Sequence, residues 1–167
     1  MLEAGQIVLV DTNVIIEAHE TRCWAALANF FACHAVEKVV EETQTGFQRR
    51  SPDRNIDVHA LRHSLAHVAT VSDEARAAFN LRHGHPPLDA GERDLLIYAE
   101  QLTDEVWLLN SPDMAVVRFA NQVGWLDRLV SLEAMTRRLN LRPGRALARN
   151  YSEPWLSERK VRLRLGA

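Results

Sequence analysis

The stretch IVLVDTNVIIE, residues 7–17, constrains the fold more than any other part of this chain. Its first four residues are aliphatic, as is typical of a strand buried on both faces of a parallel sheet. Asp11 ends this run, and an apolar pattern typical of a helix begins directly after it. Ligands bind at the carboxyl ends of the strands in open α/β sheets, so we expect Asp11 at a functional edge. The simpler role for Asp11 or Asn13 is that of a helix N-cap.

A second strand with the same kind of ending is expected near residue 110. The apolar run at residues 106–109 predicts a buried strand, and the polar turn Asn-Ser-Pro-Asp at residues 110–113 leads into a helix. Strands and helices alternate along the rest of the chain, which predicts one α/β domain with a parallel sheet. Further strands are expected at residues 35–36, 70–71 and 128–130, and helices at residues 13–32, 37–46, 56–69, 72–83, 89–102, 113–124 and 131–139.

Length and composition favour a compact cytoplasmic protein. A chain of 167 residues is long enough to bury one sizeable core. No apolar run approaches the ~20 residues of a membrane span, and the N-terminus lacks the basic region of a secretory signal, so we expect no membrane association. Cys23 and Cys33 form neither a disulfide framework nor a CxxC motif, which suits a reducing cytoplasm.

The last part of the chain is basic, whereas the rest is acidic. Residues 137–167 contain nine Lys and Arg and two Glu, and residues 1–136 contain 11 basic and 20 acidic residues. We therefore expect an α/β domain over residues 1–140 and a basic extension over residues 141–167, with Trp155 outside the core. Near its end, basic residues interleave with apolar ones: Arg159, Lys160, Arg162 and Arg164. This pattern predicts an edge strand or short helix whose apolar side docks on the domain or on a second subunit and whose basic side attracts nucleic-acid phosphates. The alternatives are an ordinary solvated surface, a tail that only packs, and a tail that binds an acidic partner segment.

Acidic side chains gather at the predicted ends of these elements. Asp11 and Asp113 follow two strands that would lie side by side, and more acids occupy the helices nearby: Glu41, Glu42, Asp89, Glu92 and Asp94. Converging carboxylates raise one another's pKa and cannot all ionise without a cation. Oxygen ligands favour Mg²⁺ or Mn²⁺. Such an ion polarises a phosphoryl oxygen and activates a bound water, so the pattern predicts phosphodiester hydrolysis.

Three histidines offer a different metal site. His59, His63 and His67 recur every four residues on the helix expected at residues 56–69, and this spacing can chelate zinc. We favour the alternative, in which the three histidines lie on a solvated helix face.

Taken in order, these motifs resemble the PIN domain, the family of metal-dependent nucleases that includes the VapC-type toxins. The resemblance covers about residues 7–136. It rests on the strand followed by Asp-Thr-Asn, on Glu42 four residues before Gly46, on Gly-Glu-Arg-Asp at residues 91–94, and on Leu-Leu-Asn-Ser-Pro-Asp at residues 108–113. It implies a three-layer sandwich in which helices flank a central parallel β-sheet.

The resemblance also implies roles for single residues. Asp11 matches the first acid of the family, and Asn13 matches the polar group that fixes it. Glu42 matches the second acid. Asp113 matches the fourth acid, and Ser111 stands where the family usually has Thr or Ser.

The third acid is open between two positions. Asp94 fits one form of the family motif and Glu92 fits the form found in related subfamilies. Two residues that are two positions apart on a helix lie about 200° apart around its axis, so only one of them can face a metal. We favour Asp94, because its spacing to Ile97 gives it a consistent face.

These observations predict an endoribonuclease that hydrolyses RNA with Mg²⁺ or Mn²⁺ as cofactor. The resemblance implies RNA as substrate and, for a toxin, an antitoxin protein as partner, and we also expect a homo-oligomer. The alternative is a PIN-like module that binds RNA or protein without catalysis. A phosphatase of the haloacid dehalogenase type is disfavoured, because Asn13 stands where that chemistry needs a second Asp.

Overall fold

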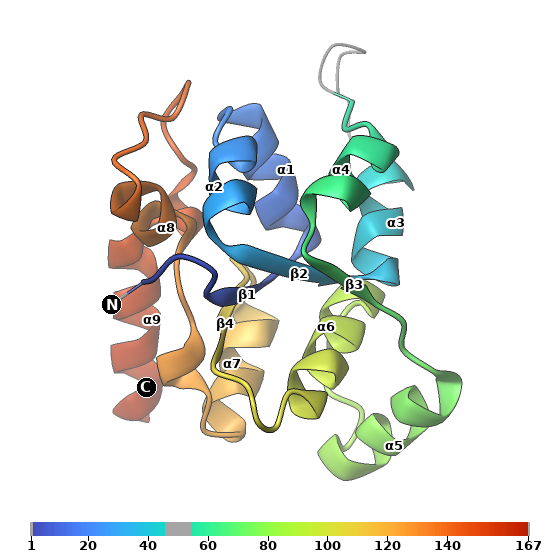
Figure 1. Ribbon diagram of the computed structural model, residues 1–167. Coiled ribbons are helices and arrows are strands. Elements are labelled where there is room, and N and C mark those ends of the chain that lie inside the picture. The colour runs from blue at the N-terminus through green and yellow to red at the C-terminus, as the bar shows by residue number, and fades with distance from the viewer. Residues whose placement is uncertain (1, 46–54, 167) are drawn as a thin grey trace.

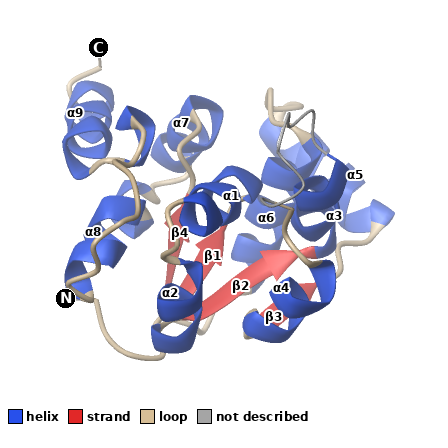
Figure 2. Ribbon diagram, turned by 90° about the horizontal axis from the view of Figure 1, so that it is seen from above, coloured by secondary structure: helices blue, strands red, loops and turns tan. Residues whose placement is uncertain are grey.

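A parallel β-sheet forms the centre of the computed structural model, which describes residues 2–45 and 55–166. Within these ranges the sheet has four strands in the order β3-β2-β1-β4, and Figure 2 shows them side by side. The strands are β1 (Ile7–Val10), β2 (Ala32–Val36), β3 (His67–Ala69) and β4 (Trp107–Asn110). All pairings are parallel, as the apolar runs predicted. The two strands that precede Asp11 and Ser111 are neighbours.

Helices cover both faces of this sheet (Figure 1). One layer contains α1 (Thr12–Glu20), α2 (Trp24–Phe30), α3 (Glu37–Thr45) and α4 (Val58–Ser64). The opposite layer contains α5 (Asp73–His83), α6 (Ala90–Gln101) and α7 (Met114–Gln122). Beyond β4 lie α8 (Leu132–Arg138) and α9 (Glu153–Arg164), with the short 3-10 helices η2 (Leu126–Arg128) and η3 (Arg149–Tyr151). The three-layer sandwich is therefore confirmed.

The core lies between the sheet and the two helical layers. Val8 and Leu9 of β1 are fully buried, because a central parallel strand is covered on both faces. Ile15 of α1 and Leu96 of α6 are also fully buried. Within the described ranges, no helix has both the length and the apolar character needed to cross a membrane.

Three predictions of local structure were wrong. The strand expected at residues 70–71 is not formed there, because β3 ends at Ala69. The helix expected over residues 56–69 ends at Ser64, and His67–Ala69 instead pairs with β2 as strand β3. Helical periodicity cannot show this switch, because it depends on pairing with a strand about 30 residues earlier. The strand expected at residues 128–130 is reduced to a single bridge between Leu109 and Leu129.

The C-terminal extension packs on the domain through α9, which contacts α7 and α8. Trp155 and Leu156 are buried in the core, with 9% and 3% of their surface exposed. The expectation that Trp155 lies outside the core is therefore wrong. The expected short helix is present, and burial of these two side chains fixes it on the body.

Helix α9 runs in the opposite direction to β4. Near its start, Glu153 accepts a 2.6 Å hydrogen bond from Ser131. Further along, Lys160 donates to the Leu129 carbonyl oxygen at 2.7 Å, and Arg164 near the end pairs with Asp127. Along α9 the contacted residues therefore run backward in the sequence, from Ser131 to Asp127. Because the segment at Leu129 is parallel to β4, the basic end of α9 points away from the edge where the strands end.

Candidate active site

Asp11 lies at the carboxyl edge of the sheet, the edge formed by the C-terminal ends of the strands. The parallel register of β1 and β4 sets Val10 beside Asn110, so the next residues on each strand, Asp11 and Ser111, become neighbours. Ser111 Oγ donates a 2.8 Å hydrogen bond to Asp11 Oδ2. The Thr12 backbone N–H donates to Asp11 Oδ1 at 2.6 Å, so Asp11 also serves as the N-cap of α1.

Burial raises the pKa of Asp11 to about 7. Only 3% of the residue is exposed, and loss of hydration disfavours the charged carboxylate. The hydrogen bond from Ser111 lowers the pKa, whereas the charges of Asp89 and Glu42 raise it further. Asp11 therefore holds a negative charge only at a cost in the metal-free protein.

Glu42 reaches this edge from α3. Thr12 Oγ1 donates to Glu42 Oε2 at 2.9 Å, and the Gly91 backbone N–H donates to Glu42 Oε1 at 3.1 Å. Burial is the main cause that raises the pKa of Glu42, and the charge of Asp89 adds to it. Thr12 thus touches both Asp11 and Glu42 and joins α1 to α3. Gly46, which the family spacing used, lies outside the described residues.

Glu92 and Asp89 come from the start of α6, where they form a capping box. The Glu92 N–H donates to Asp89 Oδ1 at 2.8 Å, and the Asp89 N–H donates to Glu92 Oε2 at 3.0 Å. Glu92 is only 4% exposed. Burial raises its pKa to about 8, and the charges of Asp89, Asp113 and Asp11 raise it as well.

Asp113 lies at the end of β4 and begins α7. Its Oδ1 accepts a 2.7 Å hydrogen bond from the Ala115 N–H, which makes it the N-cap of that helix. The Asp113 N–H donates to Ser111 Oγ at 3.3 Å. Ser111 therefore links Asp113 to Asp11.

We call this group the carboxylate site; its acids are Asp11, Glu42, Asp89, Glu92 and Asp113. Four of these acids lie at the starts of three helices, α1, α6 and α7, and Glu42 lies inside α3. Helices α1 and α7 begin just after the neighbouring strands β1 and β4. Within the described part of the chain, no Lys or Arg forms an ion pair with Asp11, Glu42, Glu92 or Asp113. Burial is the main cause of the raised pKa values of Asp11, Glu42 and Glu92, and no ion pair with a cation among the described residues offsets it.

Asp94 does not join the carboxylate site. It is 2% exposed and accepts hydrogen bonds from Arg76, with Nε to Oδ1 at 3.0 Å and Nη2 to Oδ2 at 2.7 Å. This pairing ties α6 to α5 and neutralises the carboxylate. The structure thus places Glu92, and not the favoured Asp94, near Asp11 and Asp113, because the two side chains leave α6 in different directions.

The other predicted residues are placed as follows. The Asn13 side chain is exposed and makes no hydrogen bond to any described residue. Asp11 is held by Ser111 and the Thr12 N–H instead of by Asn13.

The basic residues of α9 have partners elsewhere. Lys160 donates to the Leu129 carbonyl oxygen, Arg162 pairs with Glu158 at 3.0 Å, and Arg164 pairs with Asp127. The Arg159 guanidinium lies 5.8 Å from the Trp155 ring centre. None of these contacts joins α9 to the carboxylate site.

The donor set of the carboxylate site suits a hard divalent cation chemically, because every ligand atom is an oxygen. Yet among the residues described, no three His, Cys, Asp or Glu side chains are close enough to hold one ion directly. This covers His59, His63 and His67 as well, and His67 lies on β3 rather than on the helix. Mg²⁺ commonly keeps several waters and binds one or two carboxylates, so the site fits an ion held partly through water.

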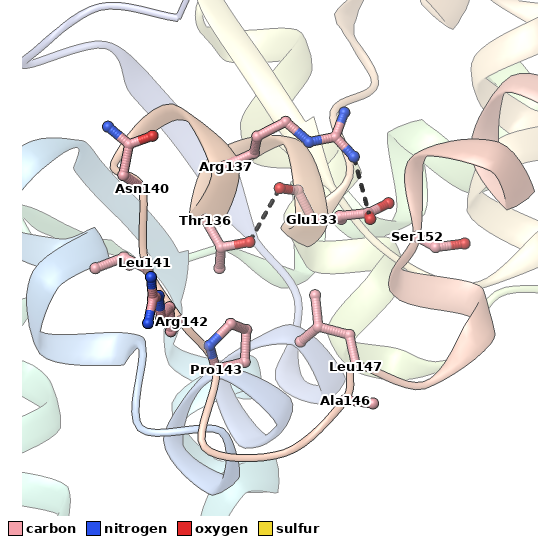
Figure 3. Close-up of a pocket in the computed structure, with 10 residues that line it drawn as sticks. All are labelled: Glu133, Thr136, Arg137, Asn140, Leu141, Arg142, Pro143, Ala146, Leu147 and Ser152. Atoms are coloured by element: carbon pink, nitrogen blue, oxygen red, sulfur yellow. Dashed lines mark hydrogen bonds and ion pairs between the residues drawn. The ribbon is translucent and has the colours of Figure 1, made fainter.

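A pocket of about 670 Å³ lies away from these acids, between α8 and the segment that follows it (Figure 3). Figure 3 shows Leu147 and Pro143 facing the space and the Arg137 guanidinium directed toward Glu133, at 3.2 Å. No acid of the carboxylate site lines this pocket. Its walls include the C-terminal extension, so the extension does more than pack through α9.

Sequence reasoning missed three residues that shape the carboxylate site. Thr12 and Gly91 lie inside motifs that the sequence indicated, but their contacts to Glu42 span 30 and 49 residues. The third is Tyr151, whose hydroxyl donates to the Asn13 carbonyl oxygen at 3.2 Å across 138 residues. No local sequence pattern could predict a contact between residues so far apart in the chain.

No protein-family model matches this chain, and no curated protein matches it in sequence. The likeness to the PIN domain therefore rests on the order of the sequence motifs and stays a prediction.

Proposed function

We propose that this protein is a divalent-metal-dependent endoribonuclease. The observation that carries this proposal is a group of acids at and beside the ends of two neighbouring parallel strands, of which Asp11 and Glu92 are buried. Within the described ranges, no Lys or Arg forms an ion pair with Asp11, Glu42, Glu92 or Asp113. Asp11 and Glu92 have pKa values of about 7 and 8, so they hold protons that a divalent ion would displace. An uncompensated group of acids of this kind is costly to the fold, and clusters of perturbed carboxylates are common at functional sites.

The residues of the carboxylate site would have two roles, holding the metal ion and orienting Asp11. Asp11, Glu42, Glu92 and Asp113 would hold Mg²⁺ or Mn²⁺, directly or through water. When bound, such an ion polarises a phosphoryl oxygen and lowers the pKa of a bound water. Ser111 and the Thr12 N–H fix the two oxygens of Asp11, so that this carboxylate needs no rearrangement when substrate binds.

One finding favours a second candidate, a PIN-like module that binds RNA or protein without catalysis. The acids of the described chain do not converge into a direct three-ligand group. If an ion is instead held partly through water, the rate of RNA cleavage will depend on the concentration of that ion. A binding module will show no cleavage at any ion concentration.

The test is cleavage of fluorescently labelled single-stranded RNA by the purified protein in Mg²⁺, in Mn²⁺ and in excess EDTA. We expect cleavage with either ion and none in EDTA. Asp11→Asn should abolish cleavage, and Asp104→Asn, which changes an exposed acid before β4, should not. Cleavage that persists in EDTA would refute the metal dependence, and RNA binding without any cleavage would support the binding module.

A toxin role can be tested in cells. Expression of the protein in bacteria should stop growth, and Asp11→Asn should relieve the arrest if RNA cleavage is the cause. An antitoxin, if one exists, should restore growth when expressed together with the wild-type protein. Growth that is unaffected by the wild-type protein would separate the nuclease proposal from the toxin proposal.

A further inference from the structure

A segment of the C-terminal extension lies along α1, the helix that begins at the carboxylate site. We call residues 144–151 the strap. The Gly144 N–H donates to the Thr21 carbonyl oxygen at 2.8 Å at one end of α1, and the Tyr151 hydroxyl donates to the Asn13 carbonyl oxygen at the other. As the chain advances along the strap, its contacts therefore move back along α1 toward Asp11.

Arg145 fastens the middle of the strap. Its guanidinium donates to Glu17 Oε1 and Oε2 at 2.9 and 2.8 Å, and to Glu20 Oε2 at 2.6 Å. The Ala148 N–H donates to Glu17 Oε1 at 3.0 Å. Glu17 is only 5% exposed, so its charge is satisfied almost wholly by the strap. A fork of two parallel charged hydrogen bonds fixes direction as well as distance.

These contacts follow one face of α1. Asn13, Glu17 and Thr21 are spaced by four, which places them one above another on a helix. From Asn13 to Thr21 the helix rises about 12 Å, at 1.5 Å per residue. The strap is anchored at both ends and in the middle of this face, so it restrains the helix along almost its whole length.

The first turn of α1 is also where Asp11 is held. Asp11 receives the Thr12 N–H, and Thr12 Oγ1 donates to Glu42. Movement of this turn would therefore shift two acids of the carboxylate site together. Tyr151 contacts the turn directly through Asn13, and it lies close enough to Asp11 for the charge of Asp11 to raise its pKa, after burial and Glu17.

We propose that Arg145 and Tyr151 are positioning residues of the active site: the strap fixes the first turn of α1 and, through it, the Asp11 and Glu42 carboxylates. The C-terminal extension is then part of the catalytic apparatus, although it lies outside the segment that resembles the nuclease family. The catalytic consequence rests on the proposed function, whereas the restraint on α1 does not.

The test uses full-length variants of the strap. Arg145→Met removes the charged fork, and Tyr151→Phe removes only the hydroxyl. Arg149→Met is the matched control, because Arg149 lies on the same strap, has a side chain 79% exposed, and lies 3.7 Å from Glu158. Arg145→Met leaves the buried charge of Glu17 without its partner, and this could unfold the protein. The double variant Glu17→Met/Arg145→Met removes both charges, so it tests the same contact if the single variant unfolds.

Two measurements are made on each folded variant. Amide hydrogen exchange of residues 12–15 in metal-free protein reports the restraint on α1, with α7 as internal reference. Cleavage kinetics report kcat, KM and the Mg²⁺ concentration for half-maximal rate. We expect faster exchange in the first turn, a kcat lower by about tenfold to a hundredfold, a higher Mg²⁺ requirement and little change in KM, since small misplacements of catalytic groups have effects of this size. Tyr151→Phe should change these quantities less, and Arg149→Met should not change them.

If the folded Arg145→Met and Glu17→Met/Arg145→Met variants showed wild-type exchange and wild-type kcat, the proposal would be overturned. If the wild-type protein cleaves no RNA in Mg²⁺ or Mn²⁺, the proposed function fails, but the exchange measurement still decides whether the strap restrains the carboxylate site.

Discussion

The backbone N–H of Gly91 donates a 3.1 Å hydrogen bond to Glu42 Oε1, and a Cβ atom at position 91 would lie 2.3 Å from Glu42 Oε2. A side chain at this position would have to displace the Glu42 carboxylate, which is the flexible end of its side chain. The contact joins the start of α6 to α3, so the position of Glu42 depends on the absence of a side chain at residue 91. Glycine is required here for close approach rather than for an unusual backbone angle.

Gly91→Ala should therefore displace Glu42 and impair cleavage while the fold remains. Alanine is a better helix residue than glycine by about 1 kcal/mol, so the melting temperature should fall little or rise. We expect a loss of kcat of about tenfold or more, since a small displacement of a catalytic group has a large effect. In a Glu42→Gln background the same change should have almost no further effect, and additive losses would show that Gly91 acts elsewhere.

Glu92→Gln and Asp94→Asn should have opposite effects on activity and stability. Glu92→Gln keeps the capping box, because glutamine also serves at that position, but removes an acid of the carboxylate site. We expect cleavage to be lost and the stability in EDTA to be kept or raised. Kinetics and urea unfolding on both variants measure these effects.

Asp94→Asn should instead destabilise the protein with smaller effects on kcat. Breaking a fully buried ion pair costs about 3–5 kcal/mol, and we expect about 1–3 kcal/mol here because Arg76 is one-third exposed and keeps its contact with Asp73. If Asp94→Asn abolished cleavage without loss of stability while Glu92→Gln remained active, the placement of the third acid would be wrong.

Metal-free protein should lose stability as the pH rises from about 4 to about 8. The pKa values of Asp11 and Glu92 are raised to about 7 and 8, so the stability that protonated acids contribute is present at low pH and disappears as they ionise. The difference in unfolding free energy between the wild type and Asp11→Asn isolates Asp11 from other titrating groups. The free energy of unfolding of the variant should increase relative to that of the wild type as the pH rises to about 8. If the two curves of unfolding free energy against pH were parallel, the raised pKa of Asp11 would be contradicted.

Mg²⁺ or Mn²⁺ should stabilise the wild-type protein more at pH 8 than at pH 5.5. At low pH the ion must displace protons from Asp11 and Glu92, whereas at pH 8 it meets ionised ligands and relieves their repulsion. Thermal unfolding with and without Mn²⁺ at both pH values measures this. Asp11→Asn should remove most of the difference, and a pH-independent shift would point to an ion bound elsewhere.

The basic residues of α9 should affect RNA binding less than the sequence pattern predicted. Arg164 lies roughly 16 Å along the helix from Glu153, given 1.5 Å per residue, in the direction away from the carboxylate site. We expect the double variant Arg162→Gln/Arg164→Gln to keep RNA affinity and its dependence on salt concentration. A clear decrease in the salt dependence would show that these side chains bind phosphates after all.

The sequence by itself determined the parallel sheet and the placement of several functional groups. One aliphatic run is followed by Asp11, and another is followed by Ser111 and Asp113. Such a run indicates a buried strand, and the polar residues after it indicate where the strand ends. Once two such strands are parallel neighbours, their carboxyl ends must meet, so these side chains were expected together and lie together. Helices were likewise expected from residues 72, 89 and 131, and in the structure the side chains of Ser72, Asp89 and Ser131 cap the helices that begin there.

Only the tertiary structure decided which acids share a site and what holds them there. Glu92 and Asp94 lie in one turn of one helix, and the choice between them depends on Arg76, which is 18 residues from Asp94. Strand β3 exists because it pairs with β2, although its residues continue a helical pattern. Arg145 meets Glu17 across 128 residues. Periodicity and capping report interactions within a few residues, whereas the orientation of a carboxylate depends on partners that only the folded chain brings near.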